Sequence, residues 1–131
     1  MTEPASNDPI GTPGQPWGAA ERAAWRARQR VQRSYDEDVL SVVRRLSPGF
    51  EVVPYGALER GGRHYPLLAL RPGPWRPGRP GVLVTGGVHG YETSGVHGAL
   101  RFLLGPAREL AAQVNLLVAP CVSPWSYEHI Q

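Results

Sequence analysis

The residues best suited to chemistry lie in one stretch, Gly81-Val-Leu-Val-Thr-Gly-Gly-Val-His-Gly-Tyr-Glu-Thr-Ser-Gly95. His89 and Glu92 stand three residues apart in it, shortly after the pair Gly86-Gly87. An imidazole nitrogen and a carboxylate oxygen at this spacing are suitable ligands for zinc. We therefore predict that His89 and Glu92 bind Zn²⁺, although a catalytic zinc ion ordinarily has three protein ligands.

Other interpretations of these side chains stay open. His89 could be satisfied by backbone groups at a tight turn, and Glu92 could be a carboxylate at the start of a helix, where the helix dipole stabilises it. Of the remaining histidines, His129 is the first candidate for a third ligand, because it follows a second predicted strand; a solvated loop histidine is the alternative. His97 is expected to point away from Glu92, and His64 to be exposed beside a turn. Glu128 and Cys121 are expected to be structural.

The pattern around His89 and Glu92 predicts the elements that position them. An apolar run at 82–85 predicts a buried strand, and Gly86-Gly87 allows a sharp turn at its end. A helix is expected from about 94 to 104, with Thr93 or Ser94 as its cap, and a second strand over 114–120. Strand, helix and strand in about forty residues indicate two parallel strands, with the site at their carboxyl ends.

The preceding residues complete the predicted sheet. Ser34 and Glu37 have the spacing of a capping box, and the apolar period that follows predicts a core helix ending at Pro48-Gly49. Residues 50–70 predict a hairpin that turns at 60–63. The fold class is therefore α/β, with a mixed sheet, a parallel centre and flanking helices.

The stretch Gly87-Val-His-Gly-Tyr-Glu92 resembles the metal-binding motif of the zinc carboxypeptidase family. It also resembles the wider family of zinc amide hydrolases, which includes aspartoacylases and succinylglutamate desuccinylases. The segment from Val118 to Glu128 is similar to the one in which carboxypeptidases usually carry Asn-Pro-Asp-Gly-Tyr-Glu. Pro124, Tyr127 and Glu128 fit that pattern, whereas other residues stand at the places of Asn, Asp and Gly, namely Ser123, Trp125 and Ser126. The resemblance covers roughly 50–131, the first half or less of a family domain.

The resemblance implies a zinc-dependent hydrolase of peptide or amide bonds, of the metallocarboxypeptidase kind. It implies that His89 and Glu92 are the first two zinc ligands and that the third ligand and the general base lie beyond Gln131. No catalytic residue is therefore assigned in this chain. The alternatives are an N-acyl amino-acid deacylase and a non-catalytic fragment or binding module. The expected substrate is a peptide or an N-acyl amino acid, and the oligomeric state is not predicted.

Composition bounds the remaining function classes. The 131 residues are 41% hydrophobic and carry a formal charge of +3, too small to indicate a nucleic-acid or membrane partner. One cysteine excludes an internal disulfide, and no signal peptide is evident, so a cytoplasmic location is expected.

Residues 1–18 are predicted to be a flexible leader, and 19–131 the N-terminal portion of a zinc carboxypeptidase-like domain. A helix over 19–33 would gather four arginines on one face, which we expect to be solvated; phosphate binding is the alternative (Arg22, Arg26, Arg30 and Arg33).

Overall fold

The computed structural model describes residues 8–131, and the chain divides into two compact units between Val31 and Gln32. In the described part of the first unit, residues 8–31, one helix forms, α1 (Ala19–Arg28), in which Glu21 accepts a hydrogen bond from the Gly18 backbone N–H at 2.8 Å. Part of the predicted leader, residues 1–7, lies outside the described residues.

The predicted helix over 19–33 is wrong at its carboxyl end, because α1 ends at Arg28. Arg30 and Arg33 lie beyond it, so the four arginines do not share one helical face. No residue of α1 is buried, so packing does not extend the helix.

The second unit begins with a helical segment whose first turn is capped as the sequence predicts. The Ser34 hydroxyl accepts a hydrogen bond from the Glu37 N–H at 3.1 Å. A π-helical segment, η1 (Asp36–Leu40), leads directly into α2 (Ser41–Leu46). The predicted apolar stripe of this helix is buried, at Tyr35, Val39, Val42 and Val43.

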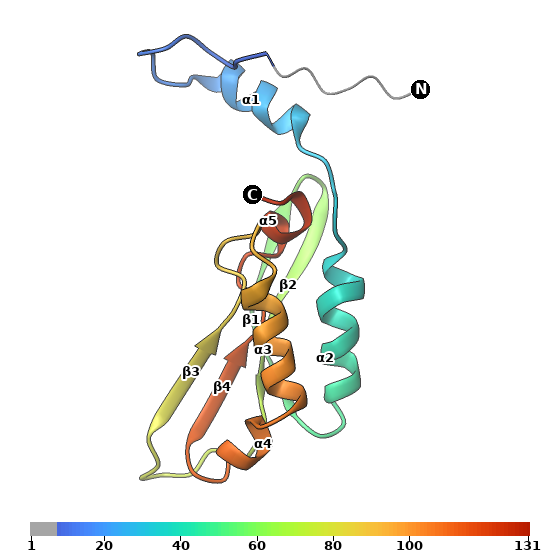
Figure 1. Ribbon diagram of the computed structural model, residues 1–131, viewed down its shortest axis with the longest axis vertical. Coiled ribbons are helices and arrows are strands. Elements are labelled where there is room, and N and C mark those ends of the chain that lie inside the picture. The colour runs from blue at the N-terminus through green and yellow to red at the C-terminus, as the bar shows by residue number, and fades with distance from the viewer. Residues whose placement is uncertain (1–7) are drawn as a thin grey trace. The chain divides into compact units, whose positions relative to one another are not determined.

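Four strands form one mixed sheet in the order β1-β2-β4-β3 (Figure 1). The strands are β1 (Glu51–Arg60), β2 (Arg63–Arg71), β3 (Gly81–Thr85) and β4 (Asn115–Ala119). β1 and β2 form the predicted hairpin, in which Gly61 and Gly62 turn with φ of 59° and 74°. β2 pairs antiparallel with β4, and β3 pairs parallel with β4. The predicted α/β class with a mixed sheet and flanking helices is confirmed. In these four strands the parallel pair, β3 and β4, lies at one edge of the sheet and not at its centre, where β2 and β4 pair antiparallel.

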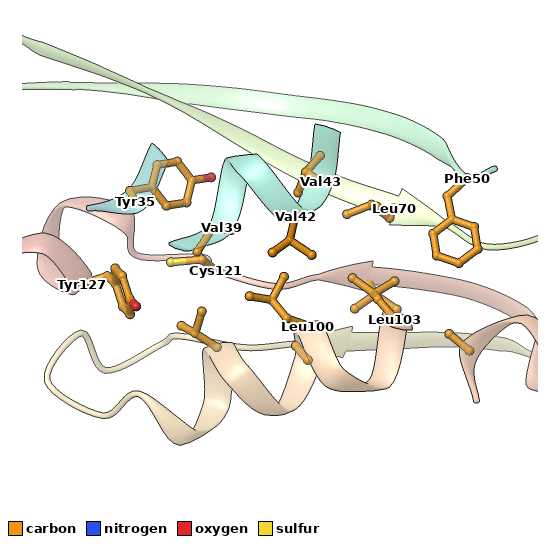
Figure 2. Close-up of a cluster of buried hydrophobic side chains, with 14 of the residues drawn as sticks. Tyr35, Val39, Val42, Val43, Phe50, Leu70, Leu100, Leu103, Cys121 and Tyr127 are labelled. Carbon is orange, nitrogen blue, oxygen red and sulfur yellow. The ribbon is translucent and has the colours of Figure 1, made fainter. Parts of the chain in front are cut away.

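The hydrophobic core lies between the sheet and two helices, α2 and α3 (Ser94–Leu104). Figure 2 shows Val42 and Val43 of α2 and Leu100 and Leu103 of α3 beside Leu70 of β2. Two shorter helices follow α3 along the chain, α4 (Ala107–Leu110) and α5 (Pro124–His129). The packing of α3 fixes the position of the loop that leads into it, which carries His89 and Glu92.

A second apolar surface lies on the strands and is not covered by a helix. Its hollow of about 240 Å³ has an entirely apolar accessible lining, to which no residue of a described helix contributes. Leu83, which lines it, is 64% exposed. The strand predicted at 82–85 is present as β3, but the prediction that it is buried is wrong, because β3 is an edge strand with mostly exposed residues. The lining residues are Val53, Tyr55, Ala69, Leu83, Thr85, Leu117, Ala119 and Val122. Within residues 8–131, no helix has the length and apolar character needed to cross a membrane.

Candidate metal site

Two glycines shape the turn that leads from β3 to the candidate ligands. Gly86 donates its N–H to the Ala119 carbonyl at 2.9 Å, and its own carbonyl accepts from the Val122 N–H at 3.0 Å. A side chain at Gly86 would collide with the backbone oxygens of Gly95 and Pro120. Gly87 has a φ of 66°, which a residue with a side chain rarely adopts. The glycine pair therefore lets the backbone pass between β4 and the start of α3.

The loop that follows is fixed by contacts with distant segments. Arg33 donates hydrogen bonds to the carbonyls of Gly90 and Tyr91, at 2.8 and 3.1 Å. The Tyr91 N–H donates to the Gln131 carbonyl at 3.1 Å. A Cβ at Gly90 would collide with the backbone of Ser126, so the loop and α5 approach closely. His89 and Glu92 are thus carried by a loop with several backbone anchors.

His89 and Glu92 converge on one open pocket. His89 Nδ1 lies 3.4 Å from Glu92 Oε2, and the two side chains are 62% and 50% exposed. The pocket has a volume of about 250 Å³ and is otherwise lined by Thr85, Gly86, Gly87, Val88 and Gly95. The His89 ring stacks on Tyr91, with centroids 5.9 Å apart and an angle of 7° between the planes.

The geometry of this pair suits a divalent metal ion. Two atoms that each lie about 2.1 Å from a tetrahedral zinc ion are roughly 3.4 Å apart. His89 Nδ1 and Glu92 Oε2 are separated by 3.4 Å, and both donors reach the solvent-accessible pocket. The nitrogen and oxygen donors also match the preference of zinc. The pair could therefore hold a metal ion, with its remaining positions filled by other ligands.

Residues 8–131 contain no group of three or more His, Cys, Asp or Glu side chains that could hold a metal ion. The suggestion of His129 as a third ligand is not supported by its position. Its side chain is buried, its ring stacks on Trp125 with centroids 4.3 Å apart, and its Nδ1 lies 2.8 Å from the Trp125 carbonyl oxygen. His97 lies in α3 and does not join the pair.

Cys121 is a core residue, as the sequence predicts. Its thiol is 1% exposed, and burial raises its pKa to about 12. A thiol that keeps its proton so firmly is a poor nucleophile and a poor metal ligand near neutral pH.

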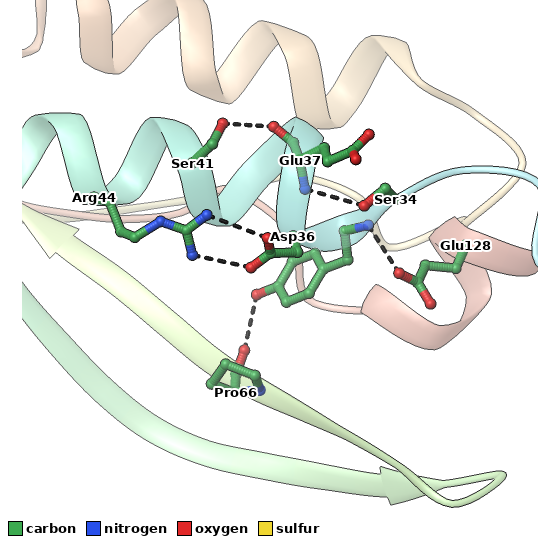
Figure 3. A network of polar contacts seen from close by, with 8 residues as sticks. Ser34, Asp36, Glu37, Ser41, Arg44, Pro66 and Glu128 are labelled. Carbon is green, nitrogen blue, oxygen red and sulfur yellow. Dashed lines mark hydrogen bonds and ion pairs between the residues drawn. The ribbon is translucent and has the colours of Figure 1, made fainter.

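Glu128 has a structural role, which the sequence also predicts. Its buried carboxylate accepts hydrogen bonds from the Tyr35 N–H and the Tyr65 hydroxyl, both at 2.9 Å (Figure 3 shows the first). Arg63 forms an ion pair with the same carboxylate at 3.2 Å. Burial, and then the bond to Glu128, raises the pKa of Tyr65 to about 12. The carboxylate joins α5, β2 and the start of the helical segment, and it takes no part in the candidate metal site.

Arg33 is the residue near the site that sequence reasoning missed. It was expected on the solvated face of a long helix, but it clamps the loop 57 residues further along the chain. Its guanidinium carbon also lies 5.2 Å from the centroid of the Tyr127 ring. A local sequence pattern does not predict such a contact, because the contact depends on how the completed fold brings Arg33 close to the loop and to α5.

Comparison with solved structures finds proteins that carry the name putative metallopeptidase. The one from Shewanella amazonensis is 28% identical, with a TM-score of 0.59, and the match covers 79% of this chain and 41% of that chain. The one from Shewanella baltica is 27% identical, with a TM-score of 0.57 and coverages of 74% and 34%. The one from Shewanella denitrificans is 27% identical, with a TM-score of 0.55 and coverages of 72% and 35%.

These proteins share the fold of this chain over most of its length, so the fold is metallopeptidase-like. The chain spans less than half the length of each of them. No family model and no curated protein matches the chain.

Proposed function

We propose that this chain is part of a zinc-dependent hydrolase of peptide or amide bonds, of the carboxypeptidase kind, and that His89 and Glu92 are two of its metal ligands. The observation that carries the proposal is the convergence of His89 Nδ1 and Glu92 Oε2, 3.4 Å apart, on an open pocket at the end of β3. The name carried by the similar Shewanella proteins supports the reaction class.

In this proposal the residues of the chain bind and orient. A bound zinc ion supplies Lewis acidity, which polarises a scissile carbonyl and lowers the pKa of water. His89 and Glu92 hold it, Arg33 keeps their loop in place, and the ring of Tyr91 supports the His89 imidazole. A third ligand and a general base of the complete enzyme would come from polypeptide outside residues 8–131.

The proposed ligands can be tested on the chain itself by a Zn²⁺ titration that follows the histidine ring resonances. We expect the His89 resonances to shift, and those of His64, His97 and His129 to stay in place. Glu92→Gln should weaken the response at His89, because it replaces an anionic ligand by a neutral amide. His97→Ala is the matched control and should leave the response intact.

The titration has clear negative outcomes. A response centred on another histidine, the absence of any response at His89, or a response unchanged in Glu92→Gln would overturn the assignment of the two ligands.

The reaction is tested separately, by offering the full-length protein peptides with a free C-terminus and N-acyl amino acids. A carboxypeptidase should release C-terminal amino acids, and zinc removal should abolish the release. Turnover of N-acyl amino acids alone would favour the deacylase alternative over the carboxypeptidase. Turnover of neither substrate would favour a non-catalytic binding module.

A further inference from the structure

Three arginines surround a pocket at the opposite end of the parallel strand pair from His89 and Glu92. The pocket has a volume of about 370 Å³ and is lined by Arg76, Arg79 and Arg108, with apolar or backbone groups between them. Arg76 and Arg79 belong to the segment that enters β3, and Arg108 to α4. Because β3 and β4 run parallel over five paired positions, their two ends are roughly 13 Å apart.

The segment that carries Arg76 and Arg79 is held by a buried amide. The Asn115 side chain is 4% exposed, and its Oδ1 accepts a hydrogen bond from the Arg76 N–H at 2.7 Å. Its Nδ2 donates to the carbonyls of Arg76 and Arg79, at 2.8 and 3.1 Å. All three bonds go to the backbone, so Asn115 holds in place the backbone from which the side chains of Arg76 and Arg79 extend. Holding donors in place before binding reduces the entropy lost on binding.

The other wall of the pocket is equally constrained. Arg79 Nη1 donates to the Ala111 carbonyl at 3.3 Å, and the Arg108 guanidinium carbon lies 4.6 Å from the centroid of the Phe50 ring. A Cβ at Gly73 would lie 3.1 Å from the Ala111 Cβ, so the two walls approach closely beside the pocket.

The charges of the cluster are not neutralised by carboxylates of the described chain. The ion pairs of the arginines within residues 8–131 involve Arg44, Arg63 and Arg71, and none involves the three arginines of the pocket. No acidic residue lines the pocket. Across the same residues, no acceptor is found for the side chain of Arg76. Its planar set of N–H donors is therefore available to a ligand.

We propose that Arg76, Arg79 and Arg108 form a binding site for a small molecule that carries phosphate. Guanidinium groups match the geometry of phosphate oxygens and bind them with paired, charge-assisted hydrogen bonds. The volume falls within the usual range of small-molecule sites. The site is separate from the candidate metal site and does not depend on the proposed hydrolase activity.

The test is a titration of the metal-free chain with pyrophosphate at constant ionic strength, followed by the arginine Nε–Hε resonances. We expect saturable shifts at the three arginines. Arg76→Ala should weaken binding about tenfold or more, equivalent to about 1.4 kcal/mol. Arg76→Lys should recover part of the affinity, because it restores the charge but not the fork of donors.

Arg101→Ala is the matched control, since Arg101 is an exposed arginine on α3 outside the pocket. It should leave the affinity unchanged. A loss in Arg101→Ala equal to that in Arg76→Ala would overturn the proposal, since it would indicate attraction to net charge alone. No saturable response to millimolar pyrophosphate would overturn it as well.

Discussion

The carboxylate of Glu128 is buried and is bound by other residues of the fold. It is 1% exposed and bonded to Tyr35, Tyr65 and Arg63. Its place in the segment that resembles carboxypeptidases therefore reflects a structural requirement of this fold. A buried carboxylate with several donors is costly to lose, because each donor is left without an acceptor.

Glu128→Ala is expected to lower the free energy of unfolding by about 2–4 kcal/mol, since it leaves the buried Tyr35 N–H and the Tyr65 hydroxyl unpaired. Urea denaturation measures the change. Glu109→Ala, which removes an exposed carboxylate from α4, should change stability by less than about 0.5 kcal/mol. Equal effects of the two substitutions would show that the buried network adds no stability.

The Cys121 thiol is expected to make the free energy of unfolding decrease as the pH rises in the alkaline range. Its pKa is raised from 9.0 to about 12 in the folded chain, so the folded state holds the proton more tightly than the unfolded state. This stabilising contribution is fully present below pH 9 and is lost as the pH rises through the folded value. Between these limits we expect the thiol to reduce the free energy of unfolding by about 1.4 kcal/mol per pH unit.

The measurement is urea denaturation from pH 8 to 11 on the natural chain and on Cys121→Ala. The charge of the Cys121 thiolate also raises the pKa of Tyr35, Tyr55 and Tyr127, so the difference between the two slopes reports the thiol together with its effect on these tyrosines. Parallel pH profiles would contradict the prediction.

Among the elements, the loop between β3 and α3 depends on the absence of a side chain at Gly90. Gly90→Ala is expected to lower the free energy of unfolding by about 1–3 kcal/mol, because the new methyl group would collide with the backbone of Ser126. Thermal unfolding measures it. Gly98→Ala is the matched control in α3, where a Cβ meets nothing within 4 Å, and it should stabilise by about 0.5–1 kcal/mol. A stabilising Gly90→Ala would mean that α5 does not pack on the loop.

Local patterns were sufficient to predict most of the elements. The 3.6-residue period from Tyr35 to Leu46, the Gly-rich hairpin turn and the strand, helix and strand after Gly81 all correspond to structure, because each is encoded by neighbours in sequence. The π-helical start of the first core helix and the short helix α5 were not predicted. The apolar positions in the sequence do not distinguish a π-helical segment from an α-helix. The helix α5 has only six residues, too few to show an apolar period.

The candidate site was only partly predictable, for the same reason. His89 and Glu92 are close in sequence, so their spacing predicts that they meet, and their side chains lie 3.4 Å apart. The clamp by Arg33 and the burial of His129 against Trp125 depend on tertiary packing. The end of α1 at Arg28 depends on a lack of packing, which an arginine period alone does not reveal.

At the level of the whole second unit, the uncovered apolar surface of the sheet should bind hydrophobic dyes. We expect 8-anilinonaphthalene-1-sulfonate fluorescence to rise with the folded chain, and to fall by about half or more in Leu83→Glu, which places a charge in the apolar hollow. Leu104→Glu changes a leucine of similar exposure, 57% against 64%, outside the hollow and should have little effect. Equal fluorescence in both variants would show that the dye binds elsewhere.

The bond between the Tyr35 N–H and Glu128 spans 93 residues of sequence, and this separation bears on how the chain folds during synthesis. At about 5–20 residues per second, roughly 5–19 seconds pass between the appearance of the two residues at the ribosome. Until α3 and β4 have been made, which takes most of that interval, the first core helix has neither of them to pack against, so its apolar stripe stays open to other contacts. Closure of so long a loop also slows folding relative to proteins with local contacts. The helical segment is therefore expected to complete its packing only after Glu128 has been made.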